Sequence, residues 1–241
     1  MRRLLSEFVG TSMLVAVVVG SGIAAQRLSP NDQGLQLLEN ALATALGLFV
    51  LVLLFQPISG AHFNPVVSLV DAALGSRPWR EVASYIPTQI IGGIVGALLA
   101  NAMFGLPVAQ ISETARWSWP HALAEAIATA GLVLVIFVLA RTGRAAWIAP
   151  AVGSYIGAAY FFTSSTAFAN PAVTVGRVFS DTFAGIDPAS ALGFVVAQLV
   201  GGMGGLLLVR LVTPGDSSRP GETAALAAAS DSATPTICPA S

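Results

Sequence analysis

The sequence predicts an all-α membrane protein with six transmembrane helices and two re-entrant half-helices, arranged as two inverted repeats. Three observations point to this fold class. The chain has 241 residues, of which 55% are hydrophobic and only 10% are charged, whereas soluble globular proteins carry about 25% charged residues. It contains six long apolar stretches, and only the fourth includes a charge, Glu125. Two shorter apolar stretches, each with an Asn-Pro pair, lie between the long ones.

The composition excludes several other classes of protein. So much apolar sequence excludes intrinsic disorder for most of the chain, and the single cysteine, Cys238, excludes a disulfide scaffold. A net charge of −1 provides no basic surface for nucleic acid. Two histidines and one cysteine offer no constellation of nucleophile, base or metal ligands within the spans. We therefore expect no catalytic residues, no cofactor, no metal and no nucleic-acid partner, with the lipid bilayer as surroundings.

The six apolar stretches are the expected spans, because about 20 mostly apolar residues cross a bilayer as a helix. They are 8–26, 40–61, 82–112, 121–140, a run that begins near residue 145 and stays uncharged until Arg177, and 188–209. Six spans place both termini on one side. If that side is the cytoplasm, eight of the eleven arginines are cytoplasmic, as the positive-inside rule requires. We expect a multi-pass protein of the cell inner (plasma) membrane with both termini cytoplasmic.

Two segments, 59–75 and 165–179, are too short to cross the membrane alone. Each contains Asn-Pro followed by an apolar stretch that is compatible with a helix. Proline fits the first turn of a helix because its missing N–H would have no partner there. We therefore expect a half-helix to begin at Asn64 and another at Asn170.

The chain also contains an internal repeat. Three landmarks recur in the same order at nearly the same separation, namely Glu7 and Glu125 (118 apart), Asn64 and Asn170 (106 apart), and Gln89 and Gln198 (109 apart). Three spans per repeat force the two repeats to be inverted in the membrane. We expect a channel domain at 1–213, with repeats at 1–104 and 120–213. The segment 214–241 is rich in Pro, Ser, Thr and Ala and is expected to be a disordered cytoplasmic tail.

Two half-helices from opposite faces would meet with their N-termini at the centre of the membrane. Each helix dipole places about half a positive charge there, and the Asn64 and Asn170 amides would donate N–H groups toward a lumen. Such a midplane favours neutral hydroxylated solutes and opposes cations. The residues expected at the midplane are Asn64, Pro65, Val66, Asn170, Pro171 and Ala172.

With its SGAHFNPV and FANPAV boxes, the chain resembles the aquaporin and glycerol-facilitator family, the major intrinsic proteins, over roughly residues 4–212. The family's first box normally reads Asn-Pro-Ala, whereas Val66 follows Asn64-Pro65 here. The resemblance implies an aquaporin-like fold, small neutral solutes as substrates, and a homotetramer in which each protomer has its own pore.

The resemblance also locates a selectivity filter. In the family's water channels a hallmark arginine stands three residues after the second box's asparagine, and that position is Val173 here. The family's offsets give Thr44, Ala158 and Ala167 as the other filter positions. This ring is small, largely apolar and without a fixed cation. It therefore predicts an atypical, aquaglyceroporin-like channel for glycerol, other small polyols and metalloid hydroxides such as arsenite or methylated arsenicals, and for water.

Four further residues have expected roles around the pore. Glu7 and Glu125 are expected to accept hydrogen bonds from backbone N–H groups of the two half-helix loops, because an ionisable group in a span needs a partner. His62 would lie at the inner pore mouth, as a hydrogen-bonding loop residue or a pH gate. Arg177, one turn outward from Val173, would lie in the outer vestibule or extend to lipid headgroups.

Three alternatives remain open. A mainly water-conducting aquaporin would share every feature of the spans and boxes. An ion-coupled secondary transporter also uses broken helices at the midplane, but it needs carboxylates that face the pore, and both deep acids have structural explanations. A purely structural tetramer would narrow its pore with bulky residues, whereas the expected ring is small.

Overall fold

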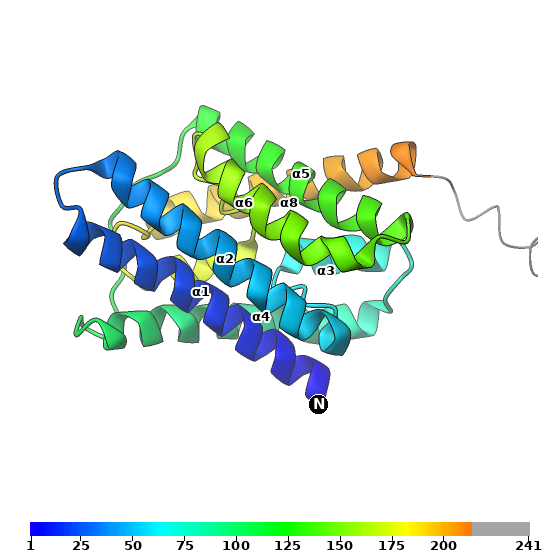
Figure 1. Cartoon of the computed structure of the whole chain (residues 1–241), viewed down its shortest axis with the longest axis horizontal. Helices are drawn as coiled ribbons and strands as arrows, with labels where there is room; N and C mark the ends of the chain where they lie inside the picture. The colour runs from blue at the N-terminus through cyan, green and yellow to red at the C-terminus, as the bar shows by residue number, and fades with distance from the viewer. Residues whose placement is uncertain (214–241) are drawn as a thin grey trace, which may run out of the picture.

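The computed structural model describes residues 1–213, and this part of the chain is helical with no strand. Figure 1 shows long helices running side by side in one bundle. The elements are α1 (Arg2–Leu28), α2 (Gln33–Ser59), α3 (Pro65–Ala73), α4 (Trp79–Met103), α5 (Trp119–Arg141), the 3-10 turn η1 (Ala145–Trp147), α6 (Ile148–Phe162), α7 (Pro171–Arg177) and α8 (Pro188–Val212). The expected tail, 214–241 with Cys238, lies outside the described residues.

Six spans are long and apolar enough to cross a membrane: α1, α2, α4, α5, η1 together with α6, and α8. The prediction of six spans is confirmed for residues 1–213. The third span is shorter than expected, because α4 ends at Met103 although the sequence stays uncharged to Ser112. Gly105 adopts a positive φ of 69° and Pro107 follows it, so the chain leaves the helix and continues as a loop.

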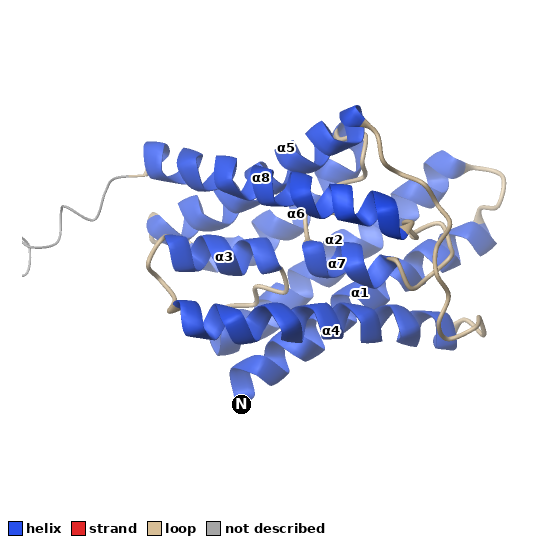
Figure 2. Ribbon diagram, turned by 180° about the vertical axis from the view of Figure 1, so that it is seen from behind, coloured by secondary structure: helices blue, strands red, loops and turns tan. Residues whose placement is uncertain are grey.

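The two short helices α3 and α7 lie in the middle of the bundle. Figure 2 shows them roughly in line, between α4 on one side and α8 on the other. Each begins at the centre and runs toward a different end of the bundle, so together they take the place of one further span. Both expected half-helices are therefore present, and each begins at the proline of its Asn-Pro pair.

The bundle has two ends, which we call the terminal face and the opposite face. The terminal face is the end where residue 1 and residue 213 both lie (Figure 1). Helix α3 runs toward this face, and Arg210 beside it donates to the Ala73 carbonyl at 2.9 Å. Helix α7 runs toward the opposite face, which also holds the 29–32 and 104–118 loops.

Glycines allow close approach of the helices that carry the two half-helices. A Cβ at Gly96 of α4 would collide with the Ser12 carbonyl of α1, and one at Gly201 of α8 would collide with the Ala126 carbonyl of α5. Small residues at such crossings let helix backbones pack closely in a membrane. The α1–α4 and α5–α8 pairs therefore correspond, one in each half of the chain.

Candidate functional site

The two half-helices begin with the same capping arrangement. The Asn64 side-chain oxygen accepts from the Val66 N–H at 2.9 Å, and the Asn170 oxygen accepts from the Ala172 N–H at 2.9 Å and the Val173 N–H at 3.3 Å. Asparagine is among the best helix-capping residues, because its oxygen satisfies backbone donors that the helix leaves free. Capping uses only the side-chain oxygen of each asparagine, so its side-chain N–H groups remain free to donate to other acceptors.

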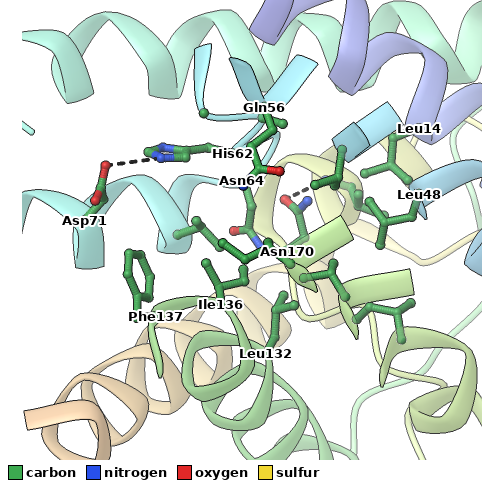
Figure 3. A pocket seen from close by; sticks show the side chains of 18 of the residues that line it. Leu14, Leu48, Gln56, His62, Asn64, Asp71, Leu132, Ile136, Phe137 and Asn170 are labelled. Carbon is green, nitrogen blue, oxygen red and sulfur yellow. Dashed lines mark hydrogen bonds and ion pairs between the residues drawn. The ribbon is translucent and has the colours of Figure 1, made fainter. Parts of the chain in front are cut away.

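The two asparagines also join the half-helices to each other. Asn64 donates from its side-chain nitrogen to the Ala169 carbonyl at 2.8 Å, and Asn170 donates to the Phe63 carbonyl at 2.7 Å. A side-chain amide has two N–H groups, so each asparagine keeps a second donor. Figure 3 shows Asn64 and Asn170 near one another at the centre of a pocket between the helices.

The loops that lead into the half-helices have a strained backbone. Ala61 and Phe63 have φ values of 50° and 48°, and Thr166, Ala167 and Ala169 in the second loop have φ values of 63°, 49° and 49°. Non-glycine residues rarely adopt this left-handed region. Such strain persists only where surrounding contacts hold the backbone in place, so other groups must bind these loops.

Glu7 and Glu125 provide those contacts. Glu7 accepts from the backbone N–H groups of His62 at 3.1 Å and Phe63 at 2.8 Å. Glu125 accepts from the N–H groups of Phe168 at 2.9 Å and Ala169 at 2.8 Å. Both glutamates are fully buried. The hydrogen bonds expected for Glu7 and Glu125 are therefore present.

Gln89 and Gln198 complete each anchor, a role that sequence reasoning missed. Gln89 donates to Glu7 at 2.8 Å and to the Ser68 hydroxyl at 3.0 Å. Gln198 donates to Glu125 at 2.7 Å and to the Thr174 hydroxyl at 2.9 Å. The signal was available in the sequence, since both glutamines lie in apolar spans at equivalent places in the repeat. A buried amide in a span requires a partner.

A cavity of about 340 Å³ runs along the half-helices. Its polar side carries Asn64 and Asn170, with His62 and Asp71 toward the terminal face (Figure 3). Its other side is apolar and is lined by Leu14, Leu48, Val52, Leu132, Ile136, Phe137, Val152 and Ile156. The cavity is therefore amphipathic along its length.

Three of the four filter positions expected from the family line this cavity. Thr44, Ala167 and Val173 line the cavity beyond the asparagines. Ala158 does not line it, because its side of α6 is exposed on the outside of the bundle. Tyr160 lines the cavity instead, and its hydroxyl lies 3.1 Å from the Thr44 hydroxyl. The prediction for Ala158 is wrong.

The error at Ala158 has a simple geometric cause. At 3.6 residues per turn, a shift of two residues turns a side chain by about 200° around the helix. An offset counted from Asn170 is reliable only if the connecting loop has the family's length. No signal in the sequence singles out Tyr160, because Ser154 and Tyr155 also place hydroxyl groups in this span. The lining of the cavity beside Thr44 is consequently not uniformly small, since it contains one aromatic ring.

Arg177 lies beyond the filter and is almost completely buried, with 3% of its surface exposed. Its Nε donates to the Ala184 carbonyl, and its guanidinium lies 3.4 Å from the centre of the Phe168 ring. It also lines the cavity. Of the two roles considered from the sequence, extension to lipid headgroups is therefore excluded.

His62 lies at the cavity mouth nearer the terminal face. Its Nδ1 lies 2.9 Å from the Ser68 hydroxyl, and its Nε2 lies 3.2 Å from an Asp71 carboxylate oxygen. Asp71 also accepts from Arg77 Nε at 3.0 Å, and Arg77 contacts Glu81 at 2.8 Å. Burial acts to lower the pKa of Arg77, but hydrogen bonds and charge from its acidic neighbours raise it overall. This mouth is therefore a network of paired charges.

The described residues contain no cluster of His, Cys, Asp and Glu that could hold a metal ion. The polar groups along the cavity are mainly amides and hydroxyls, and its charged groups lie toward the two ends. Such a lining can offer hydrogen bonds to a passing neutral solute.

Comparisons with known proteins agree with this geometry. A family model described as "Major intrinsic protein" matches residues 1–164 and 146–237. Aquaglyceroporin AqpS of Rhizobium meliloti is 47% identical over 211 residues, which cover 87% of this chain and 89% of that protein. The probable aquaporin TIP2-2 of Oryza sativa is 30% identical over 209 residues, covering 84% and 83%.

A solved structure shares the fold. The aquaglyceroporin from Plasmodium falciparum matches with a TM-score of 0.67 at 22% sequence identity, covering 87% of this chain and 93% of that one. At this identity the likeness concerns the fold: helices that cross the membrane and half-helices that meet inside it.

Proposed function

The chain belongs to the major intrinsic protein family, and we propose that it is an aquaglyceroporin-like member that conducts neutral solutes larger than water. It is a multi-pass membrane protein and a passive channel for small solutes, not an enzyme. The proposal concerns which solutes pass. We name glycerol, other small polyols and metalloid hydroxides such as arsenite or methylated arsenicals, together with water.

The single observation that carries this proposal is Val173. It lines the cavity at the position where the family's water channels have a filter arginine. A valine leaves open the part of the channel that a guanidinium would fill. Its apolar surface also lowers the free-energy barrier to the passage of less polar solutes. Thr44, Ala167 and the ring of Tyr160 complete the filter as we propose it.

The amphipathic lining supports the same class of solute. A polyol or a metalloid hydroxide has hydroxyl groups that can accept from the free N–H groups of Asn64 and Asn170. Its less polar side would face the apolar wall around Leu48, Leu132 and Ile136. Binding sites that combine apolar walls with a few placed polar groups are typical for small ligands.

The midplane supports exclusion of cations. The N-termini of α3 and α7 meet there, each with a capped but partly positive helix end. We include Pro65, Val66, Pro171 and Ala172 in this midplane because they form the first turns of the two half-helices.

We further propose a homotetramer in the cell's inner membrane, with the terminal face in the cytoplasm. The support for orientation is the placement of Arg2, Arg3, Arg77, Arg80, Arg141, Arg144 and Arg210 toward the terminal face. The tetramer rests on family likeness. Residues 1–213 would form the channel domain, with repeats at 1–104 and 120–213.

A solute panel in proteoliposomes tests the proposal. Stopped-flow swelling would compare water, glycerol and arsenous acid in wild type and in Val173→Arg. We expect wild type to pass all three, and Val173→Arg to lower glycerol flux about tenfold while reducing water flux less. Wild-type vesicles that pass water but exclude glycerol and trivalent arsenic would contradict the proposal.

A mainly water-conducting channel is the second candidate, and one observation favours it. The Tyr160 ring, whose hydroxyl lies beside that of Thr44, occupies more of the filter than the alanine expected from the sequence. The same solute panel separates the two candidates. An ion-coupled transporter has less support, because the Glu7 and Glu125 carboxylates are occupied by loop N–H groups.

A further inference from the structure

Two arginines near the opposite face share one aromatic ring. The guanidinium of Arg177 lies 3.4 Å from the centre of the Phe168 ring, and that of Arg116 lies 5.7 Å from the same centre. Guanidinium groups are attracted to the faces of aromatic rings. We call Arg116 and Arg177 the arginine pair.

One short loop holds both members of the pair. Arg177 donates from Nε to the Ala184 carbonyl. Arg116 donates from Nε to the Gly185 carbonyl and from Nη2 to the Phe183 carbonyl, both at 2.7 Å. Three successive carbonyls and one ring therefore hold two positive charges near each other although these charges repel.

Within residues 1–213 no carboxylate forms an ion pair with either arginine. The buried Glu125, whose charge acts on Arg177, is bound to the Phe168 and Ala169 N–H groups. Every ion pair in that part of the chain lies near the terminal face and involves Arg3, His62, Asp71, Arg77 or Glu81. The acids near the opposite face bind other groups: Asp181 accepts from the Glu113 N–H, and Asp187 caps α8 at the Ser190 N–H. The two mouths of the cavity thus differ, since Arg77 at one mouth is paired with Asp71 and Glu81, whereas Arg177 at the other has no carboxylate of residues 1–213 in contact with it.

Burial makes this charge effective. Arg177 is 3% exposed, and Arg116 is half-buried in the loop before α5. Burial lowers the pKa of the Arg116 guanidinium, yet an arginine remains protonated in proteins. A charge away from bulk water is poorly screened by salt, so it acts on ions inside the adjacent cavity.

The pair acts on the conduction path because Arg177 lines the cavity. Arg177 follows Val173 by four residues on α7, so both side chains lie on the same face of that helix, one turn apart. A solute that passes Tyr160 and Val173 must therefore also pass Arg177.

We propose that Arg177, reinforced by Arg116 across the Phe168 ring, is the main cation barrier of this channel. The proposal deepens the proposed function, on which it rests for the open filter at Val173. Selection of solutes by size and selection by charge then take place at different points along α7. Val173 leaves the filter wide enough for neutral solutes, and the arginine pair repels cations such as sodium or methylammonium one turn further out.

The test measures cation leak and neutral-solute flux in the same vesicles of the full chain. Arg177→Gln should keep glycerol flux within about twofold of wild type while sodium conductance and methylammonium uptake rise about tenfold or more. Arg177→Lys should keep the leak low because it keeps the charge. Arg116→Gln should give a smaller rise, since Arg116 does not line the cavity.

Arg27 provides a matched control at the same face. Its guanidinium also lies over a ring, 5.2 Å from the centre of Phe104, and it donates to the Phe104 carbonyl at 2.6 Å. It does not line the cavity. Arg27→Gln should therefore leave cation exclusion unchanged.

Several outcomes decide the proposal. Restored exclusion in the double variant Arg177→Gln, Val173→Arg would support it, because the charge returns to the path one turn inward. Arg177→Gln with normal glycerol flux and no cation leak would overturn it. If Arg177→Gln fails to fold, the cation leak of Arg116→Gln is the deciding measurement. A leak in Arg116→Gln as low as in wild type would then contradict the proposal that the arginine pair excludes cations. Wild-type protein that excludes glycerol would instead contradict the proposed function. The cation leak of the arginine variants would still test whether the arginine pair excludes cations.

Discussion

The hydroxyl of Tyr160 on α6 lies 3.1 Å from the hydroxyl of Thr44 on α2. This contact joins two packed spans from different halves of the chain at the wall of the cavity. It also fixes the Tyr160 ring, because both residues are buried, with 3% and 2% of their surfaces exposed. The wall of the cavity beside Thr44 therefore includes a residue that counting from Asn170 does not identify.

Tyr160→Ala should widen the filter. Removing the ring opens space beside Val173 and Ala167, so the flux of glycerol and of larger polyols such as erythritol should rise about threefold or more. Tyr160→Phe keeps the width and loses only the hydroxyl, so its flux should change less. Stopped-flow measurements in proteoliposomes provide the comparison.

Ala158→Leu is the control for that experiment. Ala158 faces the outside of α6, so a larger side chain there should leave every flux at the wild-type value. A strong flux change in Ala158→Leu, with none in Tyr160→Ala, would return Ala158 to the filter.

Glu7→Gln and Glu125→Gln should destabilise the protein to a similar degree. In each variant an amide replaces a carboxylate that accepts from two backbone N–H groups and a glutamine. An NH₂ group then faces those donors. A buried donor without a partner costs about 1–3 kcal/mol, so the thermal unfolding midpoint in detergent should fall.

Glu113→Gln serves as the comparison, because the Glu113 side chain is exposed. Its unfolding midpoint should match wild type. A glutamate that only anchors a loop has no role in proton movement, so proton transport that Glu125→Gln abolishes would refute the anchoring role.

Gly201→Ala and Gly204→Ala lie on the same helix and should behave differently. A Cβ at Gly201 collides with the Ala126 carbonyl, whereas a Cβ at Gly204 meets nothing within 4 Å. Overpacking a tight contact costs about 1–3 kcal/mol, so Gly201→Ala should lower the unfolding midpoint. Gly204→Ala should be neutral or slightly stabilising, since alanine favours helix. Equal midpoints for both variants would mean that the α5–α8 contact is looser than described.

Much of the fold follows from the sequence because membrane insertion leaves a simple pattern. Uncharged stretches predict the spans, and Asn64-Pro65 and Asn170-Pro171 predict where the half-helices begin. The end of α4 at Met103 was not predictable from charge, since the following loop is also uncharged. Its ending depends on backbone geometry at Gly105, which hydropathy does not report.

The site was less predictable than the fold. The sequence allowed Glu7 and Glu125 to be paired with loop N–H groups, because a carboxylate in a span needs hydrogen-bond donors nearby and few others are available. The position of Tyr160 depends on loop length, which a single sequence does not reveal. The stacking of Arg116 and Arg177 on Phe168 joins residues far apart in the chain. No local pattern encodes such a contact.

The reciprocal bonds from Asn64 to Ala169 and from Asn170 to Phe63 have a consequence for biosynthesis. A nascent chain that has completed only α1 to α4 has no partner for the Asn64 amide or the Phe63 carbonyl. The first re-entrant loop therefore keeps strained residues and lacks these two hydrogen bonds until residues 169 and 170 have been synthesised and inserted. Maturation of the first half is thus completed by the second. An arrested or truncated chain would present an open polar loop to the membrane and to quality control.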